Sequence, residues 1–385
     1  MRVAVVGIGY VQARTASSEV GYKEMRFEAA RRAYYDAGLE PKDVGGFVSC
    51  MEDVTEGTSI TDEYVPDQLG AVQRPVHTIT GDGLHGVISG AQQVLSGIFD
   101  TVLVESYSKA SNLKGHTHLI NYAIDPIMNR PLNLHPYYIA GLQMRRYIHE
   151  KGATEKQCAA VVVKNRKNAM KNSGAPYASL LSVDDVMRSY PVASPLKELD
   201  CAGFSDAAAC VIVASEKFVR ERRIKNAVWL TGVGYSSDSP NLEVRNWVRS
   251  LATEDAAKMA YKMAGIKNPT KEVGLFEIDD TFSYRELIHL EALGVCKFGE
   301  AGKLTEDGKT MPDGKIPVNA SGGWLGIGNL HECKGLYRLV EGVLQLRGEA
   351  GERQVKKDIR RVLVHSWRGL PTETCCVAIL SRDGK

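Results

Sequence analysis

The sequence lacks three features that would assign a function class directly. Its eight cysteines are scattered among 385 residues without a Cys-x-x-Cys pair, so neither a disulfide framework nor a zinc site is expected. The formal net charge is only +2, which gives no electrostatic reason to expect nucleic acid or an anionic membrane as a partner. No apolar run is long enough to span a bilayer, and the apolar start is too short for a secretory signal. These absences favour a cytoplasmic protein with reduced thiols.

Metal ligands are also lacking in a recognisable pattern. The segment 111–200 contains His116, His118 and His135, but their arrangement does not match a metal-ligand motif. We therefore expect no metal site.

A glycine-rich turn is the first positive signal. Residues 77–97 read HTITGDGLHGVISGAQQVLSG, in which Gly81-x-Gly83-x-x-Gly86 follows a β-rich run and opens a predicted helix. Glu105 ends another β-rich run about twenty residues later, which is the spacing of a dinucleotide fingerprint. A turn that carries a reactive group in a different fold is the alternative.

An internal repeat decides the architecture. Residues 27–50, FEAARRAYYDAGLEPKDVGGFVSC, match residues 254–278, EDAAKMAYKMAGIKNPTKEVGLFEI, and the segments before and after these copies match as well. Each copy predicts an amphipathic helix, a glycine stop and a buried strand. We therefore predict one β/α half from residues 1–110 with 201–226, and a second from 227–385.

The segment between the two halves, 111–200, is rich in proline and contains a predicted helix near 137–170. Such a length favours an inserted functional loop domain over a linker. Pairing of the two halves would bring the helix starts of GDGLHG and GNLHECKG together. Helix N-termini offer free N–H groups and positive potential, which suit a developing anion.

Three further stretches resemble the thiolase superfamily, in particular its sterol-carrier-type and archaeal members. FEIDDTFSYRELIHLEALG is similar to the family's D-x-F-x-x-x-E-L followed by L-E-x-L-G. VNASGGWLGIGNLHECKG is similar to V-N-x-x-G-G followed by G-H-P-x-G-x-x-G, and LDCAGFSDAAACVIVAS to the D-G-A-A-A strand. The resemblance implies an α/β thiolase fold of two duplicated halves, packed as a five-layered sandwich with an inserted loop domain. It also implies a homodimer, a coenzyme A thioester as substrate and no bound cofactor.

The sequence departs from the family pattern at the family's catalytic positions. The family's nucleophilic cysteine stands in C-A-S-G, and alignment on Gly86 puts Gly83 in its place. Asn329 replaces the histidine of G-H-P, and Asp279 stands where the sterol-carrier type has another histidine. Thiolysis needs a thiolate and a base. Residue-by-residue transfer of the family's catalytic positions to this sequence gives neither. The Gly-x-Gly-x-x-Gly motif is then interpreted as the remnant of a nucleophile turn, and no nicotinamide is expected there.

Several residues remain candidates for chemistry. Asn329 keeps a donor that can polarise a thioester carbonyl, and His85 could act as a base or donor, or pack at a dimer interface. Tyr284 could serve as an acid or base, or simply pack. Cys333 is the one cysteine that the resemblance places near the centre, although a small buried side chain is the favoured interpretation. The predicted catalytic set is Asn329, Asp279, His85, Tyr284, His331 and Cys333, and the predicted substrate-binding or oxyanion-binding set is Gly83, Gly86, Gly322, Gly323 and Asn319.

The missing cysteine selects the reaction. A β-ketoacyl-CoA needs a covalent acceptor for its acyl group, whereas a β-hydroxyacyl-CoA needs only a base and an oxyanion donor. Cysteine-less thiolase relatives that act as retro-aldolases work with a small zinc-ribbon and OB-fold partner protein. The resemblance therefore predicts retro-aldol cleavage with such a partner. A thiolase or acyltransferase with a displaced nucleophile, and a non-catalytic subunit of a heteromeric complex, stay open as alternatives.

Overall fold

The protein folds around one mixed β-sheet that divides into two equivalent halves. The computed structural model describes residues 2–52, 60–113, 115 and 121–384. His116 and His118 lie outside the described residues. The strands of the large sheet are β1 (Val3–Arg14), β2 (Gly46–Cys50), β3 (Val76–Ile79), β4 (Thr101–Lys109), β7 (Asp206–Ser215), β8 (Val228–Ser237), β9 (Leu275–Glu277), β10 (Arg361–Arg368) and β11 (Thr374–Ser381).

The strand order shows the duplication. The sheet runs β3-β2-β4-β7-β1 and then β8-β11-β10-β9. In the first half β2 pairs parallel with β3 and β4, and β7 pairs antiparallel with β4 and β1. In the second half β9 pairs parallel with β10, β11 pairs antiparallel with β10 and β8, and Val318 bridges Phe276 of β9 in the place of β3. Only three residue pairs, at positions 3–5 and 228–230, join β1 to β8.

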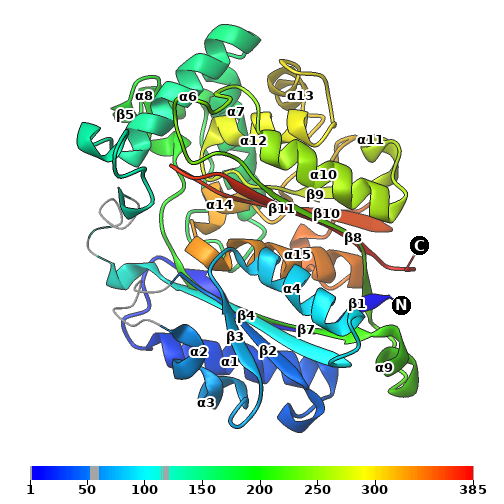
Figure 1. The fold of residues 1–385 in the computed structure, drawn as a ribbon. Helices are drawn as coiled ribbons and strands as arrows, with labels where there is room; N and C mark the ends of the chain where they lie inside the picture. The colour runs from blue at the N-terminus through cyan, green and yellow to red at the C-terminus, as the bar shows by residue number, and fades with distance from the viewer. Residues whose placement is uncertain (1, 53–59, 114, 116–120, 385) are drawn as a thin grey trace.

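The helices complete five layers, as the repeat and the resemblance predict (Figure 1). Helices α4 and α15 lie between the two half-sheets, while α1 with α2 and α3 covers the outside of the first half and α10 with α12 covers the outside of the second. These helices are α1 (Tyr22–Ala37), α2 (Thr61–Tyr64), α3 (Pro66–Leu69), α4 (Gly83–Leu95), α10 (Leu251–Ala264), α12 (Ser283–Ala292) and α15 (Lys334–Arg347). The shorter helices are α9 (Glu216–Glu221), α11 (Pro269–Glu272), α13 (Ala301–Glu306) and α14 (Gly323–Ile327). No helix among the described residues is long and apolar enough to cross a membrane.

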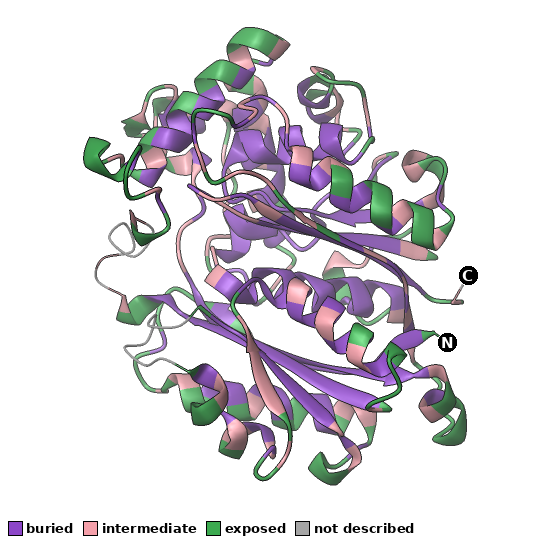
Figure 2. Ribbon diagram, in the orientation of Figure 1, coloured by how far each residue is buried: buried purple, intermediate pink, exposed green. Residues whose placement is uncertain are grey.

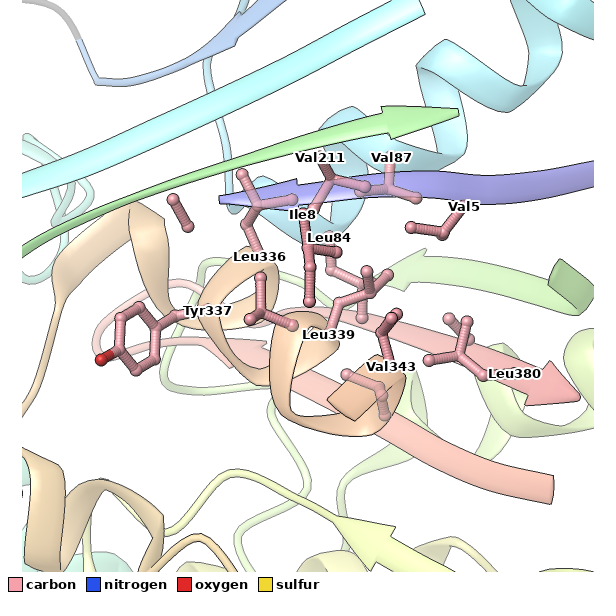
Figure 3. Packing of buried hydrophobic residues seen from close by; sticks show 14 of the residues in the cluster. Val5, Ile8, Leu84, Val87, Val211, Leu336, Tyr337, Leu339, Val343 and Leu380 are labelled. Atoms are coloured by element: carbon pink, nitrogen blue, oxygen red, sulfur yellow. The ribbon is translucent and has the colours of Figure 1, made fainter. Parts of the chain in front are cut away.

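The central layer is buried far more completely than the outer ones (Figure 2). Figure 3 shows Leu84 of α4 close to Leu336 and Leu339 of α15, below Ile8 and Val211 of the first half-sheet. The two central helices therefore share one hydrophobic core, and their starts are held in fixed relative positions by it.

The inserted segment contains two long helices where the sequence predicted a single one near 137–170. They are α6 (Pro136–Lys151) and α7 (Glu155–Ala169), followed by α8 (Val183–Arg188) and the hairpin of β5 (Pro191–Ala193) and β6 (Leu196–Lys197). Gly152 adopts a φ of 71° and ends α6, and Thr154 begins α7 with a capping box. Together these two signals override the continuous helical pattern. The domain boundaries at residues 110, 200 and 226 stay predictions.

Candidate active site

The central helices begin side by side, and one carboxylate caps both. Asp82 Oδ1 accepts a hydrogen bond from the backbone N–H of Leu84 at 2.8 Å, and Oδ2 accepts one from the N–H of Gly335 at 3.0 Å. Asp82 is buried, and burial raises the pKa of its carboxyl group. The sequence predicted that these helix starts would offer free N–H groups to a substrate anion. This prediction is wrong for Leu84 and Gly335, because the protein supplies the anion itself.

Gly83, at the position of the family's nucleophile, has no room for a side chain. A Cβ on this residue would lie 2.5 Å from the Cβ of Leu336 and 3.3 Å from the carbonyl oxygen of Glu332. Gly86 is equally enclosed, since a Cβ there would lie 1.9 Å from Cys50 Sγ. Both glycines allow α4 to approach its neighbours closely. Their predicted contact with substrate is not supported by this packing.

Asn329 lies where the second central helix begins and is partly exposed. Its backbone N–H donates to the carbonyl oxygen of Gly203, its carbonyl oxygen accepts from the N–H of Ser205, and its side-chain Oδ1 accepts from the N–H of His331 at 3.1 Å. No described residue accepts a hydrogen bond from Nδ2 of Asn329. The amide is thus oriented by its oxygen and keeps its N–H₂ group for a ligand.

His331 and Cys333 diverge although they are two residues apart. The His331 ring stacks on Phe204 with centroids 5.1 Å apart. The Cys333 thiol is fully buried and donates to the carbonyl oxygen of Ser106 at 3.3 Å. Burial raises the pKa of this thiol far above its ordinary value, so the thiolate that a nucleophile needs is disfavoured. The burial of Cys333 does not favour a nucleophilic role, and its place in the predicted catalytic set stays a prediction.

Asp279 and Tyr284 belong to the interior of the second half. Asp279 accepts from Trp324 Nε1 at 3.1 Å and pairs with Lys334 at 3.2 Å. Burial alone would raise the pKa of Asp279, but the charges of Lys334 and Arg338 outweigh it and lower the pKa. Tyr284 is fully buried and donates to Gln143 at 3.0 Å, and burial raises the pKa of its phenol. Both side chains are buried and held by these partners, and their catalytic roles stay predictions.

The Asn and Gly residues of the V-N-x-x-G-G stretch make close contacts inside the second half. Asn319 is fully buried, accepts from the N–H of Ile278 at 2.8 Å and donates to Glu286 at 2.8 Å. A Cβ on Gly322 would lie 2.5 Å from the Cβ of Ala169, and one on Gly323 would meet the Asp280 carboxylate at 2.1 Å. These three residues pack at the entry to α14, and their role in substrate binding stays a prediction.

His85 faces away from the Asn329 turn. Its ring lies 4.9 Å from the ring of Tyr235 in β8, and burial lowers its pKa. The half-buried ring packs within the chain against the other half-sheet, and its role as a base, a donor or a dimer-interface residue stays a prediction. Among the described residues no group of three or more His, Cys, Asp or Glu side chains is arranged to hold a metal ion.

The sequence analysis missed one acidic residue in this turn. Glu332 occupies the place of the second glycine in G-H-P-x-G, and its carboxyl group is buried beside Arg368, with 3.9 Å between Oε1 and Nε. Arg368 pairs with Glu52 at 2.6 Å. Oε2 of Glu332 has no hydrogen-bond partner among the described residues. A glycine replaced by glutamate within the family motif was the available signal.

All eight cysteines are free of disulfide bonds. Six are buried and two, Cys201 and Cys296, are partly buried. Burial raises the pKa of every one of these thiols. Burial thus disfavours the thiolate form that a displaced cysteine nucleophile would need, and that alternative stays a prediction.

Comparison with known proteins assigns the family. The family described as Thiolase C-terminal domain-like matches residues 234–382. Acetyl-CoA acetyltransferase of Methanothermobacter thermautotrophicus is 33% identical over 362 residues, which is 92% of this chain and 93% of the relative. The chain belongs to the thiolase superfamily. Sterol carrier protein 2 of Bos taurus is 29% identical over 92% of this chain and 68% of its own length.

A solved structure of this superfamily is similar throughout. The Ltp2-ChsH2(DUF35) aldolase superposes with a TM-score of 0.84 at 27% identity and covers 99% of this chain and 98% of its own. The relatives named above therefore include both an acetyltransferase and an aldolase. In this thiolase-superfamily chain the choice between such reactions depends on the groups that the two central helix starts present.

Proposed function

We propose that this thiolase-superfamily protein cleaves the bond between Cα and Cβ of a β-hydroxyacyl-CoA by a retro-aldol reaction, and forms it in reverse. The observation that carries the proposal is the closed position at Gly83. A thiolase transfers an acyl group to a cysteine there, and the 2.5 Å approach of Leu336 leaves no space for that side chain. A retro-aldol reaction has no acyl-enzyme intermediate and so needs no nucleophile.

The chemistry requires two functions from the protein. A base takes the β-hydroxyl proton, so that an aldehyde or ketone leaves, and a hydrogen-bond donor stabilises the enolate that forms on the thioester. Asn329 provides the donor in this proposal, because its oxygen is fixed by His331 while Nδ2 is free of described partners. No bound cofactor is required; coenzyme A enters as part of the substrate.

Structural similarity to a named aldolase also supports a retro-aldol reaction. The structure of the Ltp2-ChsH2(DUF35) aldolase is similar over 99% of this chain, although acetyltransferases are also among the relatives. We extend the proposal to a homodimer that works with a separate zinc-ribbon and OB-fold partner protein. That part rests on the likeness alone.

Product analysis tests the proposal. The protein, alone and with candidate partner proteins from neighbouring genes, is incubated with panels of β-hydroxyacyl-CoA and β-ketoacyl-CoA, and new CoA thioesters are identified by mass spectrometry. We expect a shortened acyl-CoA and a free carbonyl compound from the hydroxy panel only. Thiolysis of the keto panel with added CoA would overturn the proposal, as would inertness on both panels while a separate thiolase subunit gains activity.

A further inference from the structure

Glu332 holds a position where the family motif has no side chain. In G-H-P-x-G-x-x-G the second glycine aligns with Glu332 and the last with Gly335. The Glu332 carbonyl oxygen lies 3.3 Å from the Cβ that a residue at Gly83 would carry. The glutamate is therefore adjacent to the lost nucleophile position and three residues after Asn329. The motif's glycine is thus replaced by a residue with a carboxyl group, in a turn whose backbone packs on the lost nucleophile position.

The carboxyl group of Glu332 is buried without being fully paired. Its side chain is 7% exposed, and Oε2 has no hydrogen-bond partner among the described residues. Buried carboxylates normally satisfy both oxygens, since an unpaired polar atom costs about 1–3 kcal/mol. An unpaired oxygen at a helix start, next to a partly exposed arginine, is the arrangement of a group that binds or exchanges a proton with a ligand.

We propose that Glu332 is the proton carrier of this site, and that Arg368 and Glu52 hold it in place. This inference rests on the proposed retro-aldol function. The Glu332 carboxylate accepts the proton of the substrate's β-hydroxyl group, and the O–H electron pair becomes the C=O bond of the leaving carbonyl compound. The Cα–Cβ bond breaks and its electron pair forms the thioester enolate. The carboxylic acid then returns its proton to Cα, which regenerates the carboxylate and releases the shortened acyl-CoA.

Three other titratable groups of the candidate site already have partners. Both oxygens of Asp82 accept backbone hydrogen bonds from the two central helices. Asp279 is occupied by Trp324 and Lys334 inside the second half, and His85 packs on Tyr235. Glu332 differs from all three because one of its oxygens is free within the described part of the chain.

The surroundings of Glu332 favour reversible proton transfer at neutral pH. Burial raises the pKa of its carboxyl group to about 7, the charge of Arg368 opposes this rise, and the carboxylates of Glu52 and Asp82 add to it. These groups reach it from β10, from the end of β2 and from the start of α4. A proton carrier works best when its pKa is close to the operating pH.

A matched pair of variants tests the inference. Glu332→Gln removes the proton-accepting oxygen with little change in shape. Glu341→Gln is the control, because Glu341 lies on α15, the helix that follows Glu332 in the chain, is 7% exposed and pairs with Arg353 at 2.7 Å. We expect Glu332→Gln to lower kcat by roughly a hundredfold to ten-thousandfold, with KM and the melting temperature close to those of the control. Turnover of Glu341→Gln should stay near that of the wild type.

The pH profile separates proton transfer from a structural role. In the wild type kcat should fall as the pH decreases through about 7, because the protonated carboxyl group cannot accept a proton. The residual activity of Glu332→Gln should lack this acid limb, and Glu341→Gln should keep it. Equal turnover and equal profiles in the two variants, with cleavage still occurring, would overturn the role of Glu332 and leave the retro-aldol function standing.

Hydrogen exchange distinguishes failure of the inference from failure of the proposed function. The enzyme is incubated in D₂O with saturated acyl-CoA thioesters, and deuterium at Cα is measured by mass spectrometry. Exchange needs only the carboxylate and the enolate, not carbon–carbon cleavage. Exchange that depends on Glu332 without cleavage of any β-hydroxyacyl-CoA would support the proton carrier and reject the retro-aldol function. Absence of both exchange and cleavage would reject both.

Discussion

The two halves of this protein carry equivalent central helices that begin at the same place, yet they have diverged in opposite directions. The start of α4 is closed: Asp82 is fully bonded, and Gly83 is packed against Leu336. The turn before α15 is open in its hydrogen bonding: Asn329 and Glu332 each keep a polar atom without a described partner, although Asp82 also caps Gly335 of α15. Duplication thus allowed one helix start to become structural support while the other retained groups suited to chemistry.

The largest expected effect is on the open side. Asn329→Ala should reduce kcat for retro-aldol cleavage on the order of a hundredfold or more, because one preorganised oxyanion donor is lost. Asn329→Asp is the informative companion, since it keeps the acceptor for His331 and replaces the N–H₂ group with a carboxylate oxygen that cannot donate. Steady-state kinetics should show similar losses for both. Full activity in Asn329→Asp would show that the amide donor has no part in catalysis.

The closed side should fail when a side chain is forced into it. Gly83→Cys restores the family's residue but places Cβ 2.5 Å from Leu336. We expect overpacking to lower the free energy of unfolding by about 1–3 kcal/mol, with no gain of thiolysis. Denaturant titration measures this. Gly174→Cys is the control, because a Cβ there meets its nearest atom at an ordinary 3.4 Å.

A stable Gly83→Cys protein that forms an acyl-thioester would contradict the comparison. It would mean that the start of α4 lost its nucleophile through one substitution and still has space for a cysteine side chain. Mass spectrometry of the protein after incubation with an acyl-CoA would reveal that adduct.

A smaller effect should move the pH profile without removing activity. Arg368 opposes the rise in the pKa of Glu332, so Arg368→Met should raise that pKa further. The acid limb of kcat should then shift to higher pH, and less of the enzyme should be active at pH 7. Arg360→Met is a suitable control, since Arg360 is exposed and distant from this turn in the sequence. A profile unchanged by Arg368→Met would exclude coupling between the two groups.

The smallest expected effect is at Cys333. Cys333→Ala should leave kcat nearly unchanged and lower the free energy of unfolding by about 1 kcal/mol, because a buried thiol and its bond to the Ser106 carbonyl are lost. Turnover measures the effect on kcat, and iodoacetamide labelling of the native protein measures the accessibility of the thiol. Rapid labelling together with loss of cleavage would make Cys333 a nucleophile after all.

The sequence could predict the architecture because the signals are local or repeated. The A-A-x-x-A-Y helices, the glycine stops and the Val-Gly strands recur in both halves, and the structure has the same strand order in each. The absence of a cysteine at Gly83 was also visible, since it depends on alignment of a single motif. The prediction of one helix near 137–170 was wrong because Gly152 and Thr154 end one helix and begin another.

The candidate site was predictable only where a residue's role depends on its own motif. Asn329 was proposed in this way and its role stays a prediction, whereas the burial of Asp279 and Tyr284 could not be foreseen from their motifs. Their partners, Lys334 and Gln143, are 55 and 141 residues away in the sequence, and burial by such distant groups has no local signature.

The sequence by itself determined that two β/α halves pair and that their central helices begin together, because hydrophobic periodicity and glycine stops act over a few residues. Only the tertiary structure decided which polar groups near the two helix starts are hydrogen-bonded within the described chain and which have no described partner. Glu332 is surrounded by Asp82, Glu52 and Arg368, from three separate segments of the chain. Burial, hydrogen bonding and neighbouring charge set the protonation of a carboxyl group, and all three arise only when those segments are brought together by folding.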